Sequence, residues 1–155
     1  MIVNLNLSSM KKIFILICTL FIAVNVSAQI RKVGDIIMVN GEFGVVFAIT
    51  SDGLHGKAMS VSETNCNWDN AKTWCANLGP AWKLPTKDEL LVIYRNKAVI
   101  DSALKTNGYT TLSSGWCWSS EWYDEFCAWG VRMRDGCTGN PDKYLSTYVR
   151  AVSAF

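Results

Sequence analysis

The N-terminal segment most limits what this chain can fold into, because it decides which residues are left to fold. Lys11 and Lys12 precede an unbroken apolar run, Ile13–Val24, and small residues follow up to Ala28. The run has 12 residues, whereas a helix that spans a bilayer takes about 20. A basic start, a short apolar run and a small-residue end are typical of a secretory signal peptide.

We therefore expect cleavage after Ala28, so that residues 1–28 are removed and residues 29–155 fold as a single exported domain. Residues 1–9 are interpreted as an upstream extension, and translation can start at Met1 or at Met10. The expected location is periplasmic, secreted or cell-surface associated, with no stable membrane span after cleavage.

The exported part of the chain has balanced charge. Lys11 and Lys12 account for the whole formal net charge of +2. A neutral domain without basic clusters lacks the electrostatic footprint of a protein that binds nucleic acid or anionic lipid. We therefore expect no nucleic-acid partner.

Five cysteines follow the signal segment: Cys66, Cys75, Cys117, Cys127 and Cys137. Export favours disulfides, and an odd number leaves at least one thiol free or paired with another chain. The last three lie close together in sequence, so we expect at least one disulfide among them. No CxxC occurs, which argues against a zinc ribbon and against a thioredoxin-type pair.

The order of sequence patterns predicts an α+β fold. The first third reads as a β-meander, with a hairpin at Asn40-Gly41. Two helices are expected in the middle, and the last third reads as strands with long polar loops. The expected strands are 35–39, 43–49, 54–61, 116–120, 127–133 and 147–152.

The two helices have distinct sequence signals. Trp68, Ala71, Cys75 and Leu78 are spaced to line one helix face, and Gly79-Pro80 ends that helix. The second helix begins with a capping box, in which Thr86 and Glu89 satisfy each other's backbone N–H groups. A further short helical turn is expected at 99–104.

The segment Trp82-Lys83-Leu84-Pro85-Thr86-Lys87-Asp88-Glu89-Leu90 resembles the W-R-L-P-T-x-x-E-L signature of a bacterial domain family. That family includes the C-terminal domain of a collagen-like adhesin. Trp118-Ser119-Ser120 resembles its W-S-S strand, and Tyr148–Val152 resembles its closing V-R-C-V strand. The similarity extends from about Asn67 to Phe155.

The resemblance implies a C-type-lectin-like fold, with two helices flanked by mostly antiparallel strands and with the first and last strands close together. For the adhesin domain it implies binding of sulfated polysaccharide, an expectation that a neutral domain weakens. Ala151 stands where the family often has Cys. The G-G-S-W run of the related formylglycine-generating enzymes is absent, so their copper-dependent chemistry is not carried over.

The candidate ligand site lies in the loops of the last third, because function often sits on loops that a rigid scaffold carries. Trp122 and Tyr123 lie in a polar stretch, where aromatic faces can stack on sugars. Core packing is the more ordinary role for Trp68, Trp82 and Trp118. The candidate ligand-binding residues are Trp122, Tyr123, Glu121, Asp124, Glu125, Arg132 and Arg134.

Alternatives accompany each of these choices. Glu121, Asp124 and Glu125 offer oxygens that suit calcium, but a solvated loop explains them as well. Arg132 and Arg134 would share one strand face and bind an anion, or simply be exposed charges. His55 is the only histidine, and no nucleophile in the sequence is placed beside it.

Three functions from different classes follow. The first is an exported, non-catalytic binding module for a glycan or protein at the cell envelope, without a cofactor. The second is a structural or assembly component of the envelope that associates with itself or with a partner. The third, and the least favoured, is an enzyme of the formylglycine-generating type.

Overall fold

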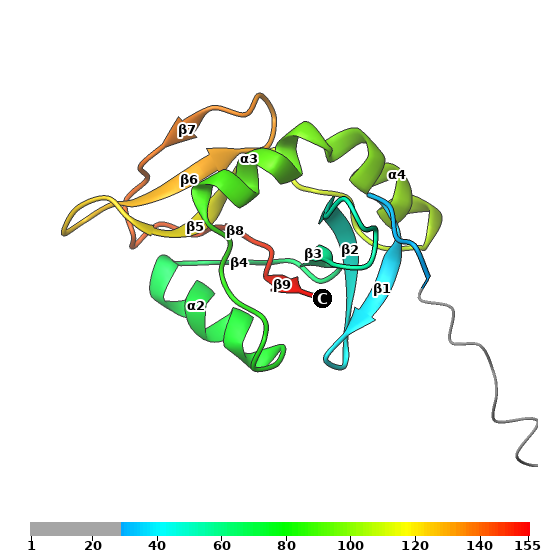
Figure 1. Cartoon of the computed structure of the whole chain (residues 1–155). Helices are drawn as coiled ribbons and strands as arrows, with labels where there is room; N and C mark the ends of the chain where they lie inside the picture. Colours follow the sequence, from blue (N-terminus) through cyan, green and yellow to red (C-terminus); the bar gives the residue numbers. More distant parts are fainter. Residues whose placement is uncertain (1–28) are drawn as a thin grey trace, which may run out of the picture.

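The computed structural model describes residues 29–155 (Figure 1). The expected signal peptide, residues 1–28, lies outside the described residues. Helices and strands follow the α+β order expected from the sequence. The strands are β1 (Ile36–Val39), β2 (Glu42–Ile49), β3 (Gly56–Ser60), β4 (Thr64–Cys66), β5 (Trp116–Trp122), β6 (Ala128–Arg132), β7 (Thr138–Gly139), β8 (Thr147–Val149) and β9 (Val152–Ala154), and the helices are α2 (Trp68–Asn77), α3 (Lys87–Arg95) and α4 (Lys97–Thr106).

The strands form two sheets. One has the order β1-β2-β3-β9 and the other the order β4-β8-β5-β6-β7. All pairings between named strands are antiparallel except that of β5 with β8, which is parallel. The first and last strands share a sheet, as expected, although β9 pairs with β3 and not with β1.

The predicted hairpin at Asn40-Gly41 is confirmed. Both residues have positive φ, 50° and 89°, as the two-residue turn that matches strand twist requires. Val39 pairs with Glu42 across the turn, and the meander continues through β3. A Cβ on Gly44 would lie 2.9 Å from the Trp82 ring, so this glycine lets the indole approach the sheet closely.

The helices are those the patterns predict, with one difference. Ala71 and Cys75 are fully buried on α2. On α3, Thr86 Oγ1 accepts from the Glu89 N–H at 3.1 Å and Glu89 Oε2 accepts from the Thr86 N–H at 2.8 Å, which confirms the capping box. The short turn expected at 99–104 is a full helix, α4, because no helix-breaking residue occurs before Asn107-Gly108.

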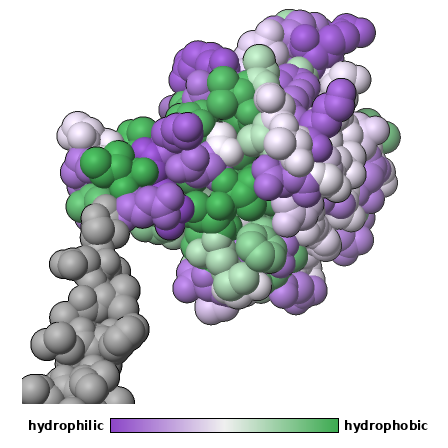
Figure 2. Space-filling view, turned by 90° about the vertical axis from the view of Figure 1, so that its right-hand side faces the viewer, coloured by the Kyte–Doolittle hydropathy of each residue, from purple (hydrophilic) through white to green (hydrophobic). Residues whose placement is uncertain are grey.

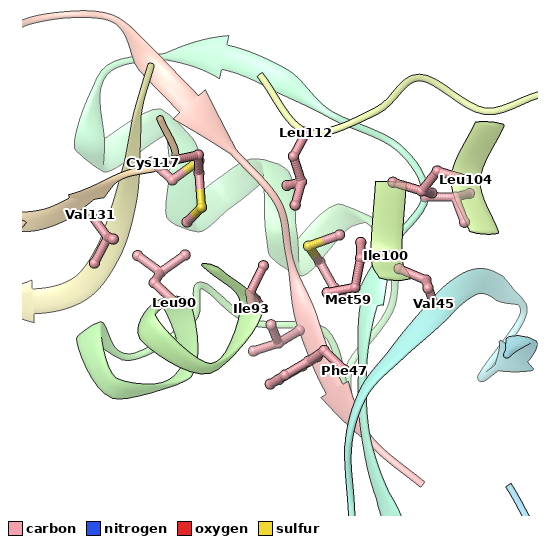
Figure 3. Close-up of a cluster of buried hydrophobic side chains, with 13 residues drawn as sticks. Val45, Phe47, Met59, Leu90, Ile93, Ile100, Leu104, Leu112, Cys117 and Val131 are labelled. Carbon is pink, nitrogen blue, oxygen red and sulfur yellow. The ribbon is translucent and has the colours of Figure 1, made fainter. Parts of the chain in front are cut away.

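The core has two parts, one on each side of the sheet that contains β3. The larger cluster packs α3 and α4 against both sheets, and its side chains point toward one another in Figure 3. The second cluster holds Trp82 and Trp118, which are 2% and 0% exposed as expected for core tryptophans. Trp82 Nε1 donates to the Val39 oxygen at 3.1 Å, and Trp118 Nε1 donates to the Cys66 oxygen at 3.0 Å.

A buried arginine joins three connections of the fold. Arg150 is 1% exposed, and its Nε donates to Glu63 Oε2 at 3.1 Å. Its other nitrogens donate to the backbone oxygens of Ser60, Val61, Thr110 and Thr111. The single side chain thus fixes the β3–β4 and α4–β5 loops relative to the β8–β9 segment.

The expected disulfide among Cys117, Cys127 and Cys137 is not formed; all five described cysteines are free. The strand register explains why. Cys117 lies on β5 with its side chain in the core, Cys127 precedes β6, and Cys137 follows the turn at the other end of β6. A strand of this length separates Cys127 from Cys137 by roughly 15 Å, and a disulfide requires Cα atoms within about 7 Å.

Candidate functional site

The β5–β6 hairpin presents the exposed aromatic side chains that the sequence analysis selected. Trp122 is 63% exposed and Tyr123 is 47% exposed. Successive side chains of a strand point to opposite faces. Tyr123 accordingly packs edge-on against Trp129, with ring centroids 5.0 Å apart, while Trp122 lines a cavity on the other face.

That cavity has a volume of about 310 Å³ and is formed by the hairpin, the start of α2 and the segment before β8. We call it the hairpin pocket. Its lining residues are Asn67, Trp68, Asp69, Trp122, Glu125, Lys143 and Tyr144.

Lys143 organises the hairpin pocket. Its Nζ donates to the backbone oxygens of Asp124 and Glu125 at 2.5 and 3.1 Å. The same ammonium lies 5.2 Å from the centroid of the Trp68 ring and 5.5 Å from that of Trp122, so both indoles attract it. Lys143 therefore holds the hairpin tip against the tryptophan at the start of α2.

Backbone contacts reinforce this junction. The Lys143 N–H donates to the Phe126 oxygen at 2.8 Å, and the Lys143 oxygen accepts from the Trp68 N–H at 3.0 Å. Asn67 caps α2, because its side-chain oxygen accepts from the Asn70 N–H at 3.0 Å. The walls of the hairpin pocket are thus held in place by the capped N-terminus of α2 and by the hydrogen bonds of Lys143 to the hairpin.

The acidic side chains of the hairpin do not converge. Glu121 Oε1 accepts from the Lys87 N–H at 2.8 Å, at the start of α3. Asp124 Oδ1 accepts from the N–H groups of Phe126 and Cys127 at 2.8 and 2.7 Å, which shapes the loop. Glu125 lines the hairpin pocket.

Glu121, Asp124 and Glu125 therefore do not form a common set of calcium ligands. In residues 29–155, no group of three or more His, Cys, Asp or Glu side chains is placed to hold a metal ion.

The two arginines lie apart from the pocket. Arg132 ends β6 at the edge remote from the hairpin tip, and its Nε donates to Asp135 Oδ1 at 2.9 Å. This hydrogen bond lowers the pKa of Asp135 to about 2. Arg134 lies beyond the strand and reaches the same carboxylate at 3.7 Å. Their charges are paired with Asp135 and do not face Trp122.

The structure adds residues that the sequence analysis did not assign to the site: Asn67, Trp68, Asp69, Lys143 and Tyr144. Trp68 was expected in the core, but it is half-buried, and its Nε1 donates to the Ser119 oxygen at 2.7 Å. Tyr144 is 80% exposed. The site was expected in the loops of the last third, which include Lys143, but the spacing along the chain does not show that Trp68 meets Lys143.

Apolar surface also occurs away from the hairpin. Figure 2 shows hydrophobic side chains gathered on the side of the molecule that carries α4 and the N-terminal strands, with hydrophilic ones around them. Ile30 and Val99 are 76% and 49% exposed.

No described helix is both long enough and apolar enough to cross a membrane.

Comparisons with known proteins place this geometry in context. Residues 48–153 match the family described as the Lcl C-terminal domain. Among solved structures the chain is similar to botrocetin, with a TM-score of 0.41 and 15% identity over 63% of this chain and 90% of that chain. No curated protein matches the sequence.

Proposed function

We propose that this chain, which belongs to the Lcl C-terminal domain family, is an exported, non-catalytic binding module whose ligand site is the hairpin pocket. The exposed face of Trp122 in a pocket with polar walls carries this proposal. The ligand class that fits best is a glycan, because sugars offer an apolar face for stacking and hydroxyls for hydrogen bonds.

The polar groups of the hairpin pocket suit sugar hydroxyls, because each hydroxyl can both donate and accept a hydrogen bond. Asn67, Asp69 and Glu125 supply acceptors, and Lys143 and the Asn67 amide supply donors. The charges around the hairpin pocket balance. Lys72 pairs with Asp69 at 2.7 Å, and Lys143 offsets Glu125. This balance favours a neutral glycan over a sulfated one.

Glycan binding is tested with a glycan array, followed by titration of the best neutral hit against the full mature chain. Trp122→Ala should lower affinity about tenfold, because removing the indole removes both its stacking face and its buried apolar area. Phe126→Ala is the matched control, because Phe126 is 59% exposed in the same hairpin but does not line the pocket. Equal losses in both variants, or binding only to sulfated glycans with steep salt dependence, would overturn the proposal.

Export is tested separately. The Lys11–Ala28 pattern motivates cleavage after Ala28. N-terminal sequencing of the protein recovered outside the cytoplasm should begin at Gln29. An uncleaved cytoplasmic product would contradict export and would leave the binding test unaffected.

A second candidate, assembly in the envelope, has one observation in its favour. Cys137 is exposed, whereas Cys75 and Cys117 are buried. An exposed thiol in an oxidising compartment can pair with another chain. The mass of the mature protein in solution, measured with and without reductant, should then differ, and Cys137→Ser should remove the difference.

A further inference from the structure

A second cavity lies between the first sheet and the start of α3. It has a volume of about 490 Å³, within the range of small-ligand pockets, and shares no lining residue with the hairpin pocket. We call it the sheet pocket. It is lined by parts of β2, β3, β9 and α3, with Phe155 at one edge.

Most of the wall of the sheet pocket is apolar. Phe47 and Ile49 come from β2, Val92 comes from α3, and Phe155 follows β9. Phe47 belongs to the main core cluster and is 1% exposed, so this wall is a fixed surface and not a loose loop. Such a wall holds the apolar body of a ligand by removing it from water.

The polar groups of the sheet pocket include an ion pair that is already complete. Glu89 is 7% exposed, and its Oε1 accepts from Lys57 Nζ at 2.7 Å while Oε2 accepts from the Thr86 N–H. Burial alone would raise the pKa of Glu89, but the hydrogen bonds from Lys57 and Thr86 outweigh it and hold the pKa below its ordinary value. The carboxylate of Glu89 therefore balances the positive charge of Lys57.

Asp88 and His55 supply acceptors at the same pocket, apart from this ion pair. Asp88 is exposed and makes no ion pair within residues 29–155. His55 Nδ1 lies 2.9 Å from Asp52 Oδ2. In the tautomer that donates from Nδ1 to Asp52, the Nε2 atom of His55 has a lone pair that can accept a hydrogen bond. An occupant that donates hydrogen bonds therefore suits Asp88 and His55, and a positive charge complements Asp88.

We propose that the sheet pocket binds a small apolar amine, whose aromatic or branched-alkyl body lies against Phe47, Ile49, Val92 and Phe155 and whose ammonium is directed to Asp88 and His55. The site is independent of the proposed glycan site and of export. A ligand carboxylate is disfavoured here, because the charge of Lys57 is already balanced by Glu89 and the exposed Asp88 would repel an anion.

The experiment compares three probes of one shape on the mature full chain: naphthylethylamine, naphthylethanol and naphthaleneacetate. Isothermal titration and naphthyl fluorescence give the affinities. The amine should bind most tightly and the acid least. Asp88→Asn should weaken amine binding about fivefold, the upper range for an exposed ion pair, and leave the alcohol unchanged. Asp69→Asn, in the first turn of α2, is the matched control and should change neither.

Two further variants locate the bound amine. Ala154→Trp places a large ring at an exposed position that lines the sheet pocket; it should weaken all three probes without lowering the melting temperature. Trp122→Ala should leave amine binding intact. The proposal is overturned if the acid or alcohol binds as tightly as the amine, if Ala154→Trp has no effect, if Trp122→Ala abolishes binding, or if no probe binds at millimolar concentration.

Discussion

The indole nitrogen of Trp68 donates a 2.7 Å hydrogen bond to the backbone oxygen of Ser119, which lies on the strand that ends in Trp122. This contact joins the first residue of α2 to β5, and the Trp68 side chain packs against the second core cluster. Trp68 is therefore held by the scaffold, and the backbone of Trp122 belongs to the strand that Trp68 contacts.

Trp122 and Trp118 lie four residues apart on β5, and their truncation to alanine should lower stability by very different amounts. Trp122→Ala should cost less than about 1 kcal/mol of unfolding free energy, because its ring is 63% exposed. Trp118→Ala should cost about 3–5 kcal/mol, because its ring is 0% exposed in the core. Chemical denaturation of both variants measures the difference. A large loss in Trp122→Ala would remove the main support for the hairpin pocket.

Lys143 should control the order of the hairpin tip. Lys143→Met removes the hydrogen bonds to Asp124 and Glu125 and the ammonium between the two indoles. Amide exchange in residues 123–127 should speed up, and Lys143→Arg should restore part of the protection because it keeps a cationic donor. Lys72→Met is the control, since Lys72 lies 3.7 Å from the Trp68 ring centroid but makes no hydrogen bond to the hairpin. Similar exchange in the Met variants of Lys72 and Lys143 would refute this role.

Arg150 should be among the costliest side chains to remove. Arg150→Met leaves Glu63 without its cationic partner and four backbone oxygens without this donor, so we expect a loss of about 3–5 kcal/mol. Arg134→Met, at an exposed ion pair 3.7 Å long, should change stability by less than about 0.5 kcal/mol. Urea unfolding provides the test. Comparable midpoints for the two variants would show that the buried network contributes little.

Glu89 should make stability depend on pH. Its pKa in the folded protein lies below the ordinary 4.5. A depressed carboxyl pKa stabilises the fold above the unfolded value, and this contribution is lost as pH falls through the folded value. Glu89→Gln should therefore be less stable than the parent by about 1–2 kcal/mol near neutral pH, with the gap closing below the ordinary pKa. Melting curves across that range should show no such convergence for the exposed Glu125→Gln, and a gap that persists in acid would contradict the assignment.

The cysteines should differ sharply in reactivity. Burial raises the pKa of Cys75 and of Cys117 to about 12, so their thiolates are scarce at neutral pH. Cys137 is exposed and should react first with a thiol reagent, whereas Cys75 and Cys117 should react only on unfolding. Mass spectrometry of labelled peptides measures the order. Early labelling of Cys117 would show that β5 is not packed as described.

Sequence patterns predicted the structure correctly where the interacting residues lie close together in the sequence. The Thr86–Glu89 capping box and the Asn40-Gly41 turn each depend on residues within one turn, and both are confirmed. The burial of Trp82 and Trp118 follows from their place in apolar patterns. The helical turn expected at 99–104 was too short, because α4 begins at Lys97 without a side-chain cap to mark its start.

The site could be predicted only in part, because it depends on strand register. Trp122 is exposed, as the polar sequence around it suggested. Its neighbours Trp68 and Lys143 meet it through the pairing of β4 with β8, which no local pattern reveals. The length of β6 likewise separates Cys127 from Cys137, although proximity in sequence and the expected oxidising compartment both favoured a bond.

The pairing of β3 with β9 has a consequence for how the protein is made. The Ala151 N–H donates to Ser60 Oγ across 91 positions of sequence, and Met59 pairs with Val152 just beyond it. Contacts between such distant segments form late, since the loop between them must close first. While the chain is still being synthesised, one edge of β3 stays unpaired and the core beside it stays incomplete. The domain therefore becomes rigid only when β9 is available to pair with β3.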